Sequence, residues 1–81
     1  MIRLKIGLLS DVSVGEICSI YAVELHERFA NRLAELGIYD GVEVRCISVA
    51  PAGSPIALWI CGTMIALRKA DCSHIMVLRT A

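Results

Sequence analysis

The sequence has little of what many binding and catalytic functions require: no excess of charge, few aromatic residues and only two histidines. Its eight basic and eight acidic residues cancel, and they are scattered along the chain instead of gathered in blocks. Nucleic-acid binding rests on a basic field that neutralises phosphates. We therefore expect no nucleic acid among the partners of this chain.

The N-terminal residues carry no sign of a secretory leader. The segment MIRLKIGLLSDV has neither the uninterrupted apolar core nor the small-residue cleavage site of a signal peptide. We expect a cytoplasmic chain, in which thiols stay reduced. Free cysteines usually behave as small buried hydrophobic residues, and we expect this of all four (Cys18, Cys46, Cys61 and Cys72).

The longest uncharged run covers residues 46–67, and its 22 residues would be long enough to span a membrane as a helix. Its middle reads PAGSP, and proline and glycine are poor occupants of a helix centre. The residues on either side alternate with a period near two. We therefore expect two strands around a turn and no transmembrane segment.

No spacing in the sequence predicts a catalytic or metal centre. Neither CxxC nor HxxxH occurs, His26 and His74 stand far apart, and no phosphate-binding GxxxxGK[ST] loop is present. Ser73 and His74 are adjacent, and neighbours on a strand point to opposite faces. We expect no enzyme, no cofactor and no metal ligands. A weak divalent-metal site, formed by tertiary approach of the cysteines, is the alternative.

A single domain spanning residues 1–81 is the expected unit at this length. Hydrophobic residues make up 57% of the chain, above the roughly 45–50% of ordinary domains. A domain this small has too little interior to bury them all. We therefore expect exposed apolar surface that serves a partner.

Period-two alternation and turn residues predict short strands over most of the chain. In the third strand, Ile47 and Val49 take the face opposite Val44, so we expect its far end to be covered on both faces. A turn at Gly62-Thr63 predicts a hairpin. Five or six short strands with one inserted helix predict a mostly β fold, a small barrel. The expected strands cover residues 1–9, 16–23, 42–49, 56–61, 64–67 and 74–79.

One amphipathic helix is predicted over residues 24–36, and a single helical turn over 68–73. Gly37 follows the long helix where a residue with positive φ is needed, and Ile38 can then fold back on the last turn. The apolar arc that should face the sheet comprises Leu25, Phe29, Leu33 and Leu36.

Three residues are candidates for contact with a partner. Trp59 lies opposite the apolar face of its strand, so it points outward if that face fills the barrel. An exposed tryptophan is a typical binding anchor, and the alternative is that the N-terminal arm or the helix covers it. Arg28 and Arg32, on the flank of the helix, could contact an acidic partner or simply be solvated.

Several segments follow one another in the order and spacing of a known family. They are LLSDV at 8–12 with Gly15, LAELGI at 33–38 with Gly41 and Val44, APAGSP at 50–55, and Gly62, Ile65, Leu67, Arg68 and IMV at 75–77. In these segments the chain resembles the ferrous iron transport protein A family, small SH3-like barrels of the bacterial cytoplasm.

The resemblance implies a non-enzymatic accessory that binds a membrane ferrous-iron permease carrying a cytosolic GTPase domain, and that regulates or assembles this transporter. It would lie in the cytoplasm, or at the inner membrane through its partner, and self-association is left open. No catalytic, cofactor or metal residues carry over. The same barrel is similar to the C-terminal module of metal-dependent repressors, and a transition-metal-binding or metal-sensing protein is the alternative.

Overall fold

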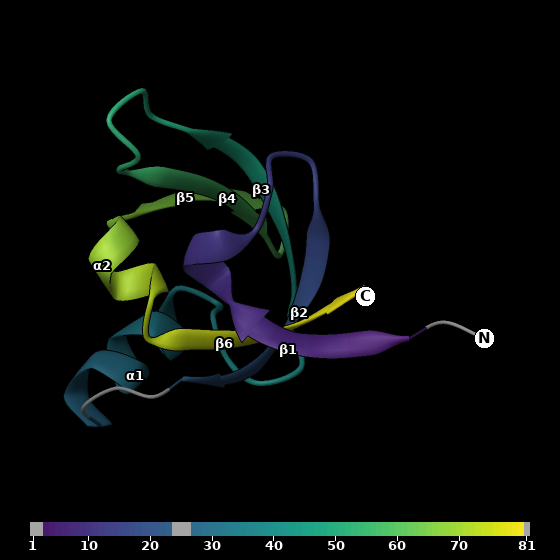
Figure 1. Cartoon of the computed structure of the whole chain (residues 1–81). Coiled ribbons are helices and arrows are strands. Elements are labelled where there is room, and N and C mark those ends of the chain that lie inside the picture. The colour runs from purple at the N-terminus through teal and green to yellow at the C-terminus, as the bar shows by residue number, and fades with distance from the viewer. Residues whose placement is uncertain (1–2, 24–26, 81) are drawn as a thin grey trace.

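The computed structural model describes residues 3–23 and 27–80 (Figure 1). Its strands are β1 (Leu4–Leu8), β2 (Ile17–Val23), β3 (Glu43–Val49), β4 (Ile56–Ile60), β5 (Thr63–Leu67) and β6 (Ile75–Thr80). Its helices are the 3-10 turn η1 (Leu9–Asp11), α1 (Glu27–Glu35) and the short α2 (Lys69–Cys72). The mostly β fold with an inserted helix is confirmed. The strand boundaries lie within one residue of their predicted positions, except that β1 begins at Leu4 and not at residue 1.

All six strands form one antiparallel sheet in the order β1-β6-β2-β3-β4-β5, so β1 and β5 are its edges. Figure 1 shows the sheet curling over on itself, with α1 and α2 near each other beside it. Register shifts at Tyr21 in β2 and Ile47 in β3 mark bulges. Bulges bend a strand and increase its twist, which helps the sheet to curl.

The curled sheet encloses one apolar core, and no polar side chain of the described residues is buried. Leu58 and Ile60 of β4 and Val77 of β6 are fully buried, as the alternation of their strands predicts. The core comprises Leu9, Val12, Cys18, Ile20, Leu33, Ile38, Val44, Cys46, Ile56, Leu58, Ile60, Leu67, Cys72, Ile75 and Val77.

The end of α1 follows the predicted capping motif. Gly37 has φ of +93°, its N–H donates to the carbonyl oxygen of Ala34, and the Ile38 N–H donates to that of Leu33 at 2.8 Å. Ile38 is buried beneath the helix end, whereas Leu36 is 51% exposed. The prediction that Leu36 faces the core is therefore wrong, because α1 ends at Glu35 and Leu36 lies in the turn that follows; Leu25 lies outside the described residues.

Three further expectations are corrected around the hairpins. The loop between β4 and β5 is Cys61-Gly62, both with positive φ, one residue earlier than predicted. This turn position leaves Cys61 exposed, so the prediction that all four cysteines are buried is wrong for Cys61 and confirmed for the other three. The far end of β3 is not covered on both faces, because Val49 is exposed and Ile47 is half-buried beside the bulge.

A half-buried ion pair joins the turn before β2 to the end of β6. Arg79 donates from Nε and Nη2 to the two carboxylate oxygens of Glu16, at 2.7 and 2.9 Å. The Arg79 hydrogen bonds hold the pKa of Glu16 below its usual value. The Arg79 stem lies across Gly7 of β1, where an added Cβ would come within 2.8 Å of Arg79 Cδ.

Substituting Gly37 by alanine tests the helix-ending motif. A Cβ there would meet ordinary contacts, the nearest at 3.7 Å from Cys61 Sγ, so the cost comes from the positive φ. We expect Gly37→Ala to lower the free energy of unfolding by about 1–2 kcal/mol in urea titrations. Gly37→Asn, which tolerates this φ better, should cost less; equal stability of Gly37→Ala and the unsubstituted chain would contradict the motif.

The Glu16–Arg79 pair predicts a pH dependence of stability. Folding lowers the pKa of Glu16. The ionised pair therefore stabilises the fold at pH values above the unfolded-state pKa of Glu16, near 4.5, and this stabilisation is lost as the pH falls through the lower, folded-state pKa. Glu16→Gln should cost roughly 1 kcal/mol at neutral pH. Its unfolding free energy should converge with that of the unsubstituted chain in acid, and a gap independent of pH would refute the pair's role. Asp71→Asn, whose partner Arg68 is largely exposed, serves as the control.

Candidate interaction surface

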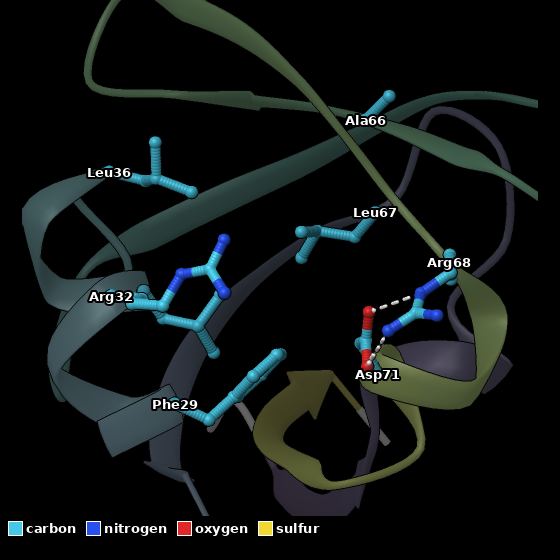
Figure 2. Close-up of a pocket in the computed structure, with 8 residues that line it drawn as sticks. Phe29, Arg32, Leu36, Ala66, Leu67, Arg68 and Asp71 are labelled. Atoms are coloured by element: carbon cyan, nitrogen blue, oxygen red, sulfur yellow. Dashed lines mark hydrogen bonds and ion pairs between the residues drawn. The ribbon is translucent and has the colours of Figure 1, made fainter. Parts of the chain in front are cut away.

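A cleft of about 260 Å³ lies between α1, the end of β5 and α2. This helix cleft is the surface where the sequence-predicted Arg32 meets residues from distant parts of the chain. Figure 2 shows Arg32 and Phe29 reaching from α1 toward the side where Leu67, Arg68 and Asp71 lie. Its lining residues are Phe29, Arg32, Leu33, Leu36, Ala66, Leu67, Arg68 and Asp71.

The helix cleft combines an apolar floor with a cationic rim. Leu33 and Leu67 are buried at its base, Phe29 is half-buried, and Leu36 is exposed. On the rim, Arg68 donates from Nε to Asp71 Oδ2 at 3.0 Å; the Arg68 side chain is 75% exposed and the Asp71 side chain 18%. Such a site suits a partner segment that offers apolar side chains beside a carboxylate.

The charge of the rim is carried by Arg32. Within residues 3–23 and 27–80, Arg32 forms no ion pair, while Asp71 offsets only Arg68. The two arginines and one aspartate therefore leave the cleft with a net positive charge. A guanidinium on an apolar surface can bind a carboxylate with two parallel hydrogen bonds, which favours an acidic ligand group.

Trp59 lines a different hollow, on the outer face of the sheet. In register, Ile17 of β2 pairs with Arg45 of β3, Arg45 with Trp59 of β4, and Trp59 with Met64 of β5. Trp59 is 47% exposed, so it points outward and the N-terminal arm and the helix do not cover it. None of the residues that line the helix cleft lines this hollow.

The structure thus separates the three sequence candidates. Arg32 lines the helix cleft, Arg28 is exposed on α1 outside it, and Trp59 lies on the outer sheet face. Sequence reasoning missed Arg68 and Asp71. Their spacing of three in a short helical turn was visible in the sequence, but their approach to α1 was not.

Chemical reactivity is low where the structure is best packed. Burial raises the pKa of Cys18 and Cys72 to about 11 and also raises that of Cys46, so these thiols are protonated at neutral pH. A protonated thiol is a poor nucleophile and a poor metal ligand. Within the described part of the chain, no three His, Cys, Asp or Glu side chains gather as a metal site would require. His26 lies outside the described residues, and His74 is exposed.

In the described ranges, no helix has the length and apolarity needed to cross a membrane. A small, strongly curled antiparallel sheet with one inserted helix defines the class: an SH3-like barrel.

Comparison with known proteins places the chain within this class. The FeoA domain family matches residues 8–79, and the chain belongs to this family. The resemblance to the ferrous iron transport protein A family is therefore confirmed. A search of curated proteins gives no match.

Three solved structures illustrate the similarity. FeoA protein from Chlorobium tepidum is 25% identical with a TM-score of 0.86, over 93% of this chain and 71% of that one. Iron(II) transport protein A from Clostridium thermocellum is 29% identical with a TM-score of 0.85, over 93% of this chain and 46% of that one. Stenotrophomonas maltophilia FeoA, solved with zinc and described as an SH3 domain protein and candidate ferrous iron transport activating factor, is 31% identical with a TM-score of 0.74, over 88% of both chains.

The repressor likeness concerns the fold alone. A manganese-dependent transcriptional repressor matches 95% of this chain with a TM-score of 0.83 at 14% identity, and only 43% of the repressor is covered. The two chains therefore share a barrel, and no regulatory role follows from it.

Fluorescence tests the position of Trp59, the only tryptophan of the chain. Because its indole is about half exposed on the outer sheet face, we expect strong quenching by acrylamide and iodide in the folded protein. The unfolded chain in urea gives the limiting value for comparison. Quenching as weak as that of a buried tryptophan would contradict the outward orientation.

Proposed function

We propose that this chain is a non-enzymatic accessory of ferrous iron uptake, which docks through its helix cleft onto the cytosolic, GTPase-bearing portion of a membrane iron permease. Membership of the FeoA domain family and the names of its structural relatives support the link to ferrous iron transport. Docking at the cytoplasmic face of the inner membrane would then follow from the partner's position.

The observation that carries the proposal is the combination of Arg32 and the apolar floor in one cleft. Exposed leucine and half-buried phenylalanine side chains there can be buried against apolar side chains of a partner, at about 25 cal/mol per Å². The net positive rim selects for a carboxylate at the same place and against basic segments.

An accessory role suits what the described residues offer. The buried thiols are protonated. Glu16 is paired with Arg79 and Asp71 with Arg68, so these carboxylates hold an arginine instead of orienting a nucleophile. Docking requires none of these groups to react. The docked chain would contribute to transport by holding the GTPase-bearing portion in one conformation. Binding achieves this when the chain has a higher affinity for one of the two conformations of that portion.

Titration of the labelled chain against the permease's cytosolic portion, with and without guanine nucleotide, tests the proposal. Arg32→Glu reverses the charge on the rim, and we expect it to weaken binding by about tenfold or more. Arg28→Glu is the matched control, because Arg28 lies on the same helix outside the cleft. Trp59→Ala tests the second hollow and should have a smaller effect.

Two results would overturn the proposal. The first is the absence of binding with either nucleotide state, together with normal ferrous uptake after deletion of the chain. The second is loss of binding in Arg28→Glu or Trp59→Ala with retention in Arg32→Glu, which would move the docking surface elsewhere. The metal-binding alternative stays a separate prediction: saturable divalent-metal binding that is lost on replacing a cysteine or a histidine.

A further inference from the structure

The helix cleft lies along the open edge of β5, which stands at the end of the strand order. Ala66, Leu67 and Arg68 are consecutive and all line the cleft, although neighbouring side chains on a strand point to opposite faces. Figure 2 shows Leu67 pointing toward α1 and Ala66 pointing away from it. No described residue of β4 lines the cleft. The backbone of β5, on the side away from β4, is therefore one of its walls.

The hairpin between β4 and β5 decides which backbone groups face this side. Both loop residues, Cys61 and Gly62, have positive φ, as in a type I′ turn. The residues that flank such a two-residue loop exchange both hydrogen bonds, and bonded and non-bonded pairs then alternate along the two strands. Met64 and Ala66 take the non-bonded positions in this register, so their N–H and C=O groups point away from β4.

The outward groups of β5 have no partner in the described part of the chain. Within residues 3–23 and 27–80, no turn, loop or side chain forms a hydrogen bond with the backbone of Met64 or Ala66. β5 also has neither the proline nor the charged residues that protect many exposed edges. Water can bond to these groups while the cleft is open. A ligand that covers Ala66 must replace that water, because burying unpaired backbone groups is costly.

We propose that the partner occupies the helix cleft as an added β-strand beside β5, hydrogen-bonded to Ala66, with an aspartate or glutamate side chain on Arg32. An extended segment offers the free N–H and C=O groups that Ala66 needs. A helix uses its own backbone groups internally and would leave those of Ala66 buried without partners. Arg32 gives the cleft its net positive charge and selects an acidic side chain in that strand. The identity of the partner rests on the proposed function, whereas the mode of binding is independent of it.

Removal of one backbone donor tests the pairing. Ala66→Pro deletes the outward N–H without breaking a bond to β4, and proline is tolerated at such edge positions. We expect it to weaken binding of the permease's cytosolic portion by about tenfold or more, because the partner's carbonyl group loses its donor. Ala66→Ser, which keeps the N–H and a small side chain, is the matched control and should bind like the unsubstituted chain. Circular dichroism and melting curves check that both variants fold.

A synthetic peptide tests the same pairing without the permease and without a substitution in the chain. The probe is a hexapeptide of valine and threonine with one central glutamate, acetylated and amidated so that its only carboxylate is a side chain. We expect saturable binding at millimolar concentration in an NMR titration, with shifts of the Ala66 amide. Replacing the glutamate by lysine should abolish this binding.

N-methylation of the peptide distinguishes an added strand from any other ligand conformation. The N–H groups of successive residues in a strand point to opposite sides. Methylating the three alternate residues that face β5 should therefore weaken binding about tenfold or more, and methylating the other three should leave it unchanged. A helical ligand, or one held by side chains alone, would show no such alternation.

The outcomes separate this inference from the docking function. Equal affinity of folded Ala66→Pro and the unsubstituted chain, equal effects of the two methylated sets, or no peptide binding at millimolar concentration would each overturn strand addition. If the permease portion binds Ala66→Pro normally, docking stands and strand addition fails. If the peptide shows the alternation while the permease portion does not bind, strand addition stands and the docking function fails.

Discussion

The structure depends on one constraint: a chain of 81 residues, 57% of them hydrophobic, can enclose only one face of its sheet. Strand alternation sends Leu58, Ile60 and Val77 into the curled interior, where they are fully buried. The alternate positions must then face outward, and several of them are apolar, including Trp59 and Met64. The outward-facing surfaces are a consequence of the same pattern that forms the core.

The helical elements turn this constraint into a specific surface. The capping motif at Gly37 sends Ile38 under α1 and leaves Leu36 outside, beside Arg32. The short α2 then brings Arg68 and Asp71 to the opposite wall. A cleft with an apolar floor and a cationic rim results where α1, the end of β5 and α2 meet, without any buried polar group among the described residues.

Most of the fold could be predicted from local patterns, because strands of period two and a glycine-ended helix have local causes. The turn at Cys61-Gly62 could not be placed to the residue, since a cysteine with φ of +49° carries no sequence signal. The candidate site was half predictable. Arg32 stands out on the helix flank, but Arg68 joins it only through tertiary packing of α2 near α1. The exposure of Leu36 could not be predicted from helical periodicity, because α1 ends at Glu35 and Leu36 lies in the turn that follows.

Docking through the helix cleft is tested most directly by chemical-shift mapping of the labelled chain with the permease's cytosolic portion. A docking role for the helix cleft predicts perturbations concentrated at Phe29, Arg32, Leu36, Arg68 and Asp71, with β1 and the Trp59 hollow unaffected. Perturbations that spare those five residues and gather on another surface would contradict the account.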